Sequence, residues 1–210
     1  MFFVKEIFKS IQGEGFHTGK KSIFVRFSGC NFWNGKTETK KTSICFFCDT
    51  NFVGTNGENG GKYSEKQLVS KINNIWENSY TNEKKFVVLT GGEPLLQVTG
   101  SLVENLKKKG FYVALETNGS IDNNISCDWV CVSPKNINKW NLRFGDEVKI
   151  IFPSVSFNLN LVKKMKFRYF FLQPMDGFKK QVNIWNTINY CKSHKPWFPS
   201  FQIHKTLNLS

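Results

Sequence analysis

The segment Phe86-Val87-Val88-Leu89-Thr90-Gly91-Gly92-Glu93-Pro94 joins four consecutive apolar residues to a polar sequence that contains two glycines. The apolar run predicts a strand that is covered on both faces, as in a parallel sheet flanked by helices. The glycines predict a loop in which the backbone can approach a ligand closely. The segment therefore predicts an α/β sheet with a binding site at the carboxyl end of a strand.

Short apolar runs alternate with segments of helical periodicity along the rest of the chain. Ser64 and Gln67 form the pattern of a capping box ahead of an apolar helical stripe. The predicted helices cover residues 64–76, 102–110, 158–165 and 179–194. The predicted strands are Val4–Phe8, Ile23–Phe27, Phe86–Leu89, Tyr112–Leu115, Trp129–Val132, Val148–Phe152 and Tyr169–Leu172.

Four polar motifs each follow a predicted strand directly. Several strands that end in polar residues favour a curved sheet whose loops converge on one binding site. An open sheet instead places its site mainly at the one point where the strand order reverses. The chain is shorter than the roughly 250 residues of a full eight-unit barrel, so we expect a partial (β/α) barrel of about six strands. The motifs are Thr90-Gly91-Gly92-Glu93, Glu116-Thr117-Asn118-Gly119, Ser133-Pro134-Lys135 and Gln173-Pro174-Met175-Asp176.

The composition bounds the class of protein. With 210 residues, 40% of them hydrophobic, and no low-complexity linker, we expect a single domain over residues 1–210. No apolar stretch approaches the roughly 20 residues of a membrane span, which predicts a cytoplasmic protein. In a reducing compartment the six cysteines are expected to be thiols or metal ligands rather than disulfides.

Three of the cysteines, Cys30, Cys45 and Cys48, follow the predicted strand at Ile23–Phe27. Three thiolates predict an iron–sulfur cluster with one iron left free to bind a group that is not protein. The alternative is a structural zinc site, which normally takes four protein ligands, and His17 is the one nearby candidate for the fourth.

The other three cysteines have an apolar setting. Cys127 and Cys131 are separated by three residues, but Pro134 occupies the position where a third cysteine would complete a closely spaced triplet. Cys131 lies in a predicted strand and Cys191 on the apolar stripe of a predicted helix. We expect all three to pack as small apolar side chains.

Seven motifs in order resemble those of the 7-carboxy-7-deazaguanine synthase family, which belongs to the radical S-adenosylmethionine enzymes. Fourteen residues separate the first two cysteines instead of the usual three, and some members of this family carry such an insert. Lengthening the loop costs only about 1.4 kcal/mol in chain entropy. The motifs are Gln12-Gly13-Glu14-Gly15, Arg26 with Gly29-Cys30-Asn31, Cys45 to Thr50, and the four motifs at strand ends.

The resemblance implies a set of cofactor ligands. Cys30, Cys45 and Cys48 would bind a [4Fe–4S] cluster, whose free iron takes the amino and carboxylate groups of S-adenosylmethionine. For Glu116 and Asn118 the alternative is a turn closed by Asn-Gly. The implied contacts of S-adenosylmethionine are Phe47, Cys48, Asp49, Gly92, Glu93, Glu116, Asn118, Ser133, Pro134, Lys135, Gln173, Pro174, Met175 and Asp176.

The resemblance also implies a substrate, 6-carboxy-5,6,7,8-tetrahydropterin. Arg26 suits its carboxylate because a guanidinium group presents a planar fork, although a strand-end surface charge is the alternative. The implied substrate contacts are Ile11, Gln12, Gly13, Glu14, Arg26, Thr90, His204 and Ser210.

The implied reaction is a radical ring contraction that yields 7-carboxy-7-deazaguanine and ammonia, in queuosine or other 7-deazapurine biosynthesis. Thr50 matches a family position whose hydroxyl binds Mg²⁺, and the alternative is a helix N-cap. The family resemblance further implies an electron donor such as flavodoxin and a homodimer.

Two rival functions are considered, and the net charge of +13 bears on one of them. A metal-stabilised nucleic-acid-binding module is favoured by charge alone, because the lysines are scattered and no recognised module accompanies them. A glycyl-radical-activating enzyme of the same superfamily is disfavoured by the cysteine spacing and by the Gln12–Gly15 motif. We expect a solvated basic surface that steers anionic small molecules.

Overall fold

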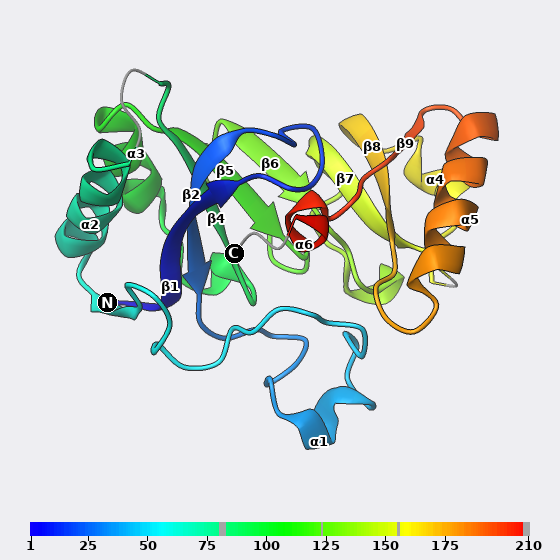
Figure 1. The fold of residues 1–210 in the computed structure, drawn as a ribbon, viewed down its shortest axis with the longest axis horizontal. Coiled ribbons are helices and arrows are strands. Elements are labelled where there is room, and N and C mark those ends of the chain that lie inside the picture. The colour runs from blue at the N-terminus through cyan, green and yellow to red at the C-terminus, as the bar shows by residue number, and fades with distance from the viewer. Residues whose placement is uncertain (80–82, 123, 155, 208–210) are drawn as a thin grey trace.

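The nine strands of the described chain form one open sheet in the order β3-β1-β2-β4-β5-β6-β7-β8-β9 (Figure 1). The structure is a computed structural model, and it describes residues 1–79, 83–122, 124–154 and 156–207. All neighbours from β2 to β9 are parallel, whereas β1 is antiparallel to both β2 and β3. This arrangement confirms the predicted parallel α/β sheet and partial barrel.

The strands are β1 (Phe2–Ile11), β2 (Lys21–Phe27), β3 (Gly61–Tyr63), β4 (Phe86–Gly91), β5 (Tyr112–Thr117), β6 (Trp129–Val132), β7 (Phe144–Phe152), β8 (Lys166–Pro174) and β9 (Trp197–Pro199). The α-helices are α1 (Thr37–Lys40), α2 (Glu65–Glu77), α3 (Gly100–Lys108), α4 (Leu159–Val162), α5 (Lys180–Ser193) and α6 (Ile203–Thr206). Short 3₁₀ helices occupy Pro94–Leu96 and Ile137–Lys139. None of the helices in these described ranges has the length and hydropathy needed to cross a membrane.

Each of the seven predicted strands lies within an observed strand. Six of them, β2 and β4 to β8, are the parallel strands expected for the barrel, and the three-residue β9 extends the parallel series. The described sheet has nine strands in all because β1 and β3 add an antiparallel edge and the short β9 follows β8. The helix expected over 158–165 is also shorter, because α4 ends at Val162.

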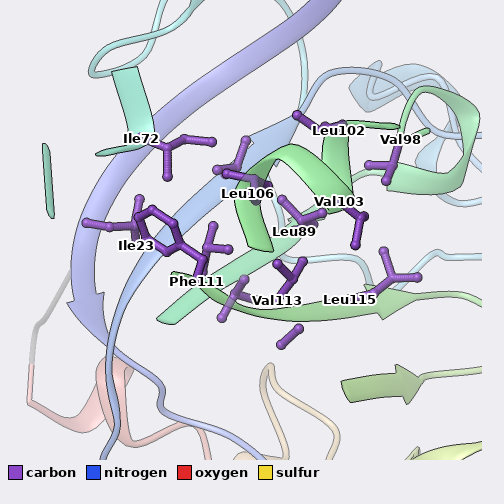
Figure 2. Close-up of a cluster of buried hydrophobic side chains, with 14 of the residues drawn as sticks. Ile23, Ile72, Leu89, Val98, Leu102, Val103, Leu106, Phe111, Val113 and Leu115 are labelled. Carbon is purple, nitrogen blue, oxygen red and sulfur yellow. The ribbon is translucent and has the colours of Figure 1, made fainter. Parts of the chain in front are cut away.

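Helices α2 and α3 cover the sheet at one end of the molecule (Figure 1). The capping box confirms the start of α2, since Ser64 Oγ accepts from Gln67 N at 3.3 Å and Gln67 Oε1 accepts from Ser64 N at 2.8 Å. In Figure 2, Ile72 of α2 and Leu102 and Leu106 of α3 point toward the strands. Burying each such side chain stabilises the fold by about 1.5–3 kcal/mol.

A second apolar cluster is formed by residues of β6 to β9, of α4 and of the segment around Trp140. It contains the fully buried residues Val132, Trp140, Val148, Ile150 and Leu172. Because both clusters attach to the same sheet, they hold its strands in one register. That register aligns the carboxyl ends of the parallel strands, pairing Phe27 with Gly91, Thr117 with Val132 and Phe152 with Pro174.

Candidate active site

A cavity of about 390 Å³ is lined by the carboxyl ends of the parallel strands, the cysteine segment and residues 202–205. Gly13, Glu93 and Pro134 do not line the cavity, and Ser210 lies outside the described residues. The predicted residues that line it are Ile11, Gln12, Glu14, Arg26, Cys30, Cys45, Phe47, Cys48, Asp49, Thr50, Thr90, Gly92, Glu116, Asn118, Ser133, Lys135, Gln173, Pro174, Met175, Asp176 and His204.

The glycine-rich loop after β4 packs directly on the start of the cysteine segment. Gly92 N donates to Phe27 O at 3.2 Å, and Glu93 N donates to Gly29 O at 3.0 Å. A Cβ atom at Gly92 would lie 2.0 Å from Gly29 O and 2.9 Å from Cys30 Cβ. Glycine is therefore required at position 92 for the loop to lie against Cys30.

The three cysteine side chains line the same cavity from two segments. Cys30 follows β2, whereas Cys45 and Cys48 share a turn closed by Cys48 N donating to Cys45 O at 2.9 Å. Burial raises the pKa of the Cys45 thiol to about 12 and also raises that of Cys30. These thiols are protonated in the free protein, so metal binding must displace their protons.

The donor set is compatible with a cubane cluster. Within the described part of the chain, no three His, Cys, Asp or Glu side chains are arranged to bind one metal ion. In a cubane cluster each thiolate binds a different iron, so the thiolates need not converge on one point. The three thiols at one cavity therefore match the requirement of a [4Fe–4S] cluster.

The expectation that His17 could complete a zinc site is wrong. Its ring packs against Phe86, Tyr112 and Trp129, which begin β4, β5 and β6, with ring centroids 5.0, 5.7 and 4.5 Å away. These positions lie at the opposite ends of the strands from the cysteines. Burial, with the nearby charge of Lys20, lowers the pKa of His17 to about 4.

The insert at residues 31–44 is anchored at its first residue. Asn31 Nδ2 donates to Ser120 Oγ at 2.7 Å, and Asn31 Oδ1 accepts from Asn118 Nδ2 at 3.0 Å. Trp33 then packs edge-on against Phe52 with ring centroids 5.6 Å apart. These contacts hold the start of the insert against the end of the sheet, and α1 projects away from the sheet (Figure 1).

The other three cysteines pack in the core as expected. Cys127 packs against the first apolar cluster, which contains Ile72, Leu102 and Leu106, and Cys191 packs against the second. Cys131 is buried within the first cluster, and it also lines the cavity. Burial raises the pKa of the Cys131 thiol well above its ordinary value, so the group is a neutral part of the cavity wall.

Glu93 lies behind the cavity wall and supports it. The side chain is 0% exposed. Its Oε1 accepts from Thr117 Oγ1 at 2.7 Å and Leu95 N at 3.0 Å, and its Oε2 accepts from Asn118 N at 2.7 Å. Burial raises its pKa, against the effect of these hydrogen bonds. Glu93 therefore fastens the loop after β4 to the end of β5.

The Gln12–Gly15 motif lies between β7 and the C-terminal segment. A Cβ at Gly13 would lie 2.3 Å from His204 Nδ1, and a Cβ at Gly15 would lie 2.5 Å from Glu147 Oε1. Gly15 also has a φ of +66°, a conformation that favours glycine. Both glycines are therefore required for this loop to pass between its neighbours.

A chain of hydrogen bonds joins four of the predicted substrate and cofactor residues. Thr90 Oγ1 donates to Glu116 Oε2 at 3.1 Å, and Gln12 Nε2 donates to Glu116 Oε1 at 2.9 Å. Gln12 Oε1 accepts from Glu14 N at 3.1 Å. The predicted Asn-Gly turn is also present, since Gly119 has a φ of +73°. Glu116 therefore lies with Gln12 and Thr90, and Asn118 lies beside the insert.

Arg26 is not a surface charge at a strand end. It lines the cavity with Glu6, and its Nε lies 2.7 Å from Glu6 Oε1. The strand register pairs Arg26 with Thr90. Its guanidinium carbon also lies 5.6 Å from the centroid of the Phe8 ring. The group is thus held beside the polar chain that begins at Thr90.

Thr50 lines the cavity two residues after Cys48. No helix begins at Thr50 or between it and β3, so the helix N-cap alternative is wrong for this described segment. In the neighbouring motif, Lys135 Nζ donates to Ser133 Oγ at 2.7 Å, and Pro134 between them is buried. These residues present hydroxyl oxygens and an ammonium group at the cavity.

The C-terminal segment covers the cavity through residues that the sequence analysis did not identify. Lys205 pairs with both Asp49 and Asp176, with 2.5 Å to Asp176 Oδ2. Gln202 Nε2 lies 3.1 Å from Asp49 Oδ2 and 2.9 Å from Glu14 Oε1. The hydrogen bond to Lys205 lowers the pKa of Asp176. Gln202 and α6 together are thereby tied to three separate parts of the cavity wall, at Glu14, Asp49 and Asp176.

Two buried charged residues of β7 were also missed. Lys149 lines the cavity and pairs with Glu14, and Glu147 Oε2 accepts from Phe16 N at 2.8 Å. A signal was present in the sequence, because Glu147 and Lys149 alternate with the apolar Val148 and Ile150. A period of two predicts that both charges share one face of the strand.

Comparisons with known proteins agree with this geometry. No protein-family model matches the chain. The chain is 44% identical over 209 residues to each of the 7-carboxy-7-deazaguanine synthases of Burkholderia multivorans and Bradyrhizobium diazoefficiens, with 99% of both chains covered. The crystal structure of QueE from Escherichia coli has a TM-score of 0.71 and 25% identity, and the match covers 96% of this chain and 93% of that chain. The chain therefore belongs to the 7-carboxy-7-deazaguanine synthase family, whose members are lyases of the radical S-adenosylmethionine type.

Proposed function

We propose that this enzyme converts 6-carboxy-5,6,7,8-tetrahydropterin to 7-carboxy-7-deazaguanine with loss of ammonia, in queuosine or other 7-deazapurine biosynthesis. The observation that carries the proposal is one cavity lined by two chemically different sets of side chains. Cys30, Cys45 and Cys48 form the first set, and the chain from Thr90 through Glu116 to Gln12 forms the second. A cofactor held at the thiols would therefore share one cavity with a heterocycle held by the polar chain.

The three thiols would hold the [4Fe–4S] cluster. When bound, the cluster and S-adenosylmethionine supply a 5′-deoxyadenosyl radical, which takes hydrogen from C6 of the pterin. Gly92 lets the backbone lie close to the methionine part of the cofactor. Further cofactor contacts would come from cavity residues at the other strand ends and beside Cys48, namely Phe47, Asp49, Glu116, Asn118, Ser133, Lys135, Gln173, Pro174, Met175 and Asp176.

The polar chain would bind the pterin. Arg26 suits the C6 carboxylate because its guanidinium carries several donors in a fixed plane. Glu14, Gln12 and Glu116 offer acceptors and amide donors to the ring edges, and His204 lies across Gly13. In this proposal Gly13, Glu93 and Pro134 shape the site from behind its wall. Ser210 stays a prediction.

A magnesium ion would complete the substrate site. Thr50 supplies a hydroxyl at the cavity, and Mg²⁺ commonly takes few protein ligands while sharing the rest with substrate and water. The carboxylate of the pterin is the natural second ligand. An electron donor such as flavodoxin and a homodimeric assembly remain predictions from the family resemblance.

The decisive experiment is anaerobic reconstitution with iron and sulfide, followed by incubation with S-adenosylmethionine, reductant and 6-carboxy-5,6,7,8-tetrahydropterin. We expect roughly four irons per chain and product formation measured by mass spectrometry. Cys45→Ala should lose both. Cys191→Ala is the matched control, because Cys191 packs in the core, and it should retain both.

Two results would count against the proposal. A wild-type protein that binds the full complement of iron but leaves the pterin unchanged would refute the substrate. A folded Cys45→Ala variant with wild-type iron content would refute the ligand set. Tight, salt-sensitive binding of random duplex DNA together with the absence of iron would favour the nucleic-acid alternative.

A further inference from the structure

Glu6 lies on the cavity side of β1 because of a break in the strand pairing. Val4 and Ile7 both belong to the first apolar cluster, although they are three residues apart. The register of β1 against β2 shifts between Val4 and Glu6, as it does at a β-bulge. The bulge therefore turns Glu6 away from the apolar cluster and onto the face that lines the cavity.

The backbone on both sides of Glu6 is held by the loop that precedes β3. Gly57 N donates to Lys5 O at 2.9 Å, and Ile7 N donates to Glu58 O at 2.8 Å. A Cβ atom at Gly57 would lie 2.8 Å from Glu6 Cβ and 3.0 Å from Glu6 Oε2. Glycine at position 57 therefore leaves room for the Glu6 side chain, and the backbone bonds anchor the bulge.

Glu6 binds one edge of the Arg26 guanidinium group. Arg26 Nε donates to Glu6 Oε1 at 2.7 Å, whereas neither Nη atom has a hydrogen-bond partner among the residues that the structure describes. The guanidinium carbon lies 5.6 Å from the centroid of the Phe8 ring, and that ring stacks on Phe24 with centroids 5.2 Å apart. The carboxylate and the ring together restrict the rotation of the guanidinium and leave its two Nη groups available.

The ion pair lies at the cavity and not behind its wall. Glu6, Phe8, Phe24 and Arg26 all line the cavity, and the strand register places Arg26 between Glu6 and Thr90. The side chains of Arg26 and Glu6 are 22% and 27% exposed, so a ligand in the cavity can reach the guanidinium. Holding the group at Nε reduces the conformational freedom that Arg26 loses when it binds a ligand.

We infer that Glu6 is a positioning residue that orients Arg26, so that the two Nη groups of the guanidinium form a receptor for one planar carboxylate of the ligand. This inference rests on the proposed function, in which the carboxylate at C6 of the pterin is that group. Two parallel N–H···O bonds give a guanidinium–carboxylate pair both strength and geometric selectivity. Glu6 thereby determines the preference for a carboxylated pterin without contacting the reacting atoms.

The charge of Glu6 has the opposite effect, which makes the two roles separable. A carboxylate beside the binding site repels the carboxylate of the ligand. If Glu6 acted only through its charge, both Glu6→Gln and Glu6→Met would bind a carboxylated pterin more tightly than the wild type does. If Glu6 orients Arg26, the two variants differ, because Gln retains an oxygen acceptor for Arg26 Nε and Met does not.

The test compares 6-carboxypterin with 6-hydroxymethylpterin, two oxidised probes that differ only in the substituent at C6. Each is titrated by fluorescence into protein reconstituted with the cluster and S-adenosylmethionine, without reductant. We expect the wild type to prefer 6-carboxypterin by at least about tenfold. Glu6→Met should reduce this preference to within about threefold, and Glu6→Gln should keep or increase it.

A double-mutant cycle adds a second readout. If Glu6 acts through Arg26, Glu6→Met should change the preference by less than about twofold in a chain that already carries Arg26→Met. Glu58→Ala is the matched control, because it removes a carboxylate from the neighbouring loop whose side chain is exposed and does not line the cavity. Glu58→Ala should keep the wild-type preference.

A folded Glu6→Met variant with an unchanged or increased preference would overturn the inference, and so would an undiminished effect of Glu6→Met in the Arg26→Met chain. If Glu6→Met does not fold, Arg26→Lys, which keeps the charge but has no planar fork, must lose the preference, and a retained preference would overturn the inference instead. A wild type that converts the pterin but binds both probes equally refutes this inference alone. A wild type that binds neither probe and does not convert the pterin would remove the proposed function itself.

Discussion

The backbone N–H of Asn118 donates to Glu93 Oε2 at 2.7 Å, and this bond joins the carboxyl ends of β4 and β5. Asn118 in turn holds Asn31, the residue after the first cysteine. The glycine-rich motif, the Asn-Gly turn and the cysteine segment thus meet around one buried carboxylate. Glu93 therefore shapes the cavity by holding these segments in place, and its own side chain does not line the cavity.

Replacing Glu93 should therefore destabilise the fold. Glu93→Ala leaves Thr117 Oγ1, Leu95 N and Asn118 N without their acceptor in a buried site, and we expect a loss of about 3 kcal/mol in the free energy of unfolding. Urea unfolding followed by circular dichroism measures it. The exposed Glu104 is the control, and Glu104→Ala should change the value by less than about 0.5 kcal/mol. Equal losses in both variants would show that Glu93 does not hold the loops.

Gly15 offers a test that separates backbone strain from lack of space. Gly15 and Gly19 both have positive φ, at +66° and +91°, but a Cβ meets Glu147 only at Gly15 and finds no atom within 4 Å at Gly19. Each alanine variant should lose about 1 kcal/mol for its backbone conformation. Gly15→Ala should lose more, and it should also weaken binding of 6-carboxypterin. If Gly15→Ala and Gly19→Ala lost the same stability and the same affinity for 6-carboxypterin, the Glu147 side chain would have moved aside at no measurable cost.

The strands could be predicted because a buried parallel strand is apolar at consecutive positions, as Phe86–Leu89 and Tyr112–Leu115 are. The strands β3 and β9 could not, because each has three residues and pairs only as a sheet edge. Their sequences, Gly61-Lys62-Tyr63 and Trp197-Phe198-Pro199, contain a glycine or a proline that is typical of turns.

The cavity could be predicted from motifs that directly follow strands, because parallel strands bring their carboxyl ends to one edge. The C-terminal segment was predicted only in part, through His204. The positions of Gln202 and Lys205 depend on how α6 folds back over Gly13, where Ile203 N donates to Gly13 O at 3.1 Å. A contact between residues so distant in the chain leaves no local pattern. His17 was misjudged for the same reason, since its aromatic neighbours come from three separate strands.

The ion pairs of Lys205 predict a pH-dependent contribution to stability. Hydrogen bonds to Lys205 lower the pKa of Asp176, and they outweigh burial to lower that of Asp49. A lowered carboxyl pKa stabilises the folded state above the unfolded pKa near 4, and the contribution disappears as the pH falls through the folded value. Lys205→Met should therefore melt at a lower temperature than the wild type at pH 7, and the difference should shrink toward pH 3.

Thermal melts between pH 3 and pH 8 check this prediction. Lys192 is exposed in the last turn of α5, and Lys192→Met is the control for loss of a lysine elsewhere on the surface. If the difference in melting temperature between Lys205→Met and the wild type stayed constant over this range, the ion pairs of Lys205 with Asp49 and Asp176 would not contribute to stability.

Thr50 predicts how the site responds to magnesium. Thr50 lines the same cavity as the cysteines but is not one of the three predicted cluster ligands. A substitution at Thr50 should therefore alter Mg²⁺ binding without altering iron content. Thr50→Val preserves the shape of the side chain and removes the oxygen. We expect it to raise the Mg²⁺ concentration needed for tight 6-carboxypterin binding by at least about tenfold. Thr50→Ser retains the oxygen and should respond like the wild type. Iron content and the binding titration are measured on the same sample. A Thr50→Val variant with full iron content and an unchanged Mg²⁺ response would reject Thr50 as a Mg²⁺ ligand, and it would not affect the assignment of the cluster site.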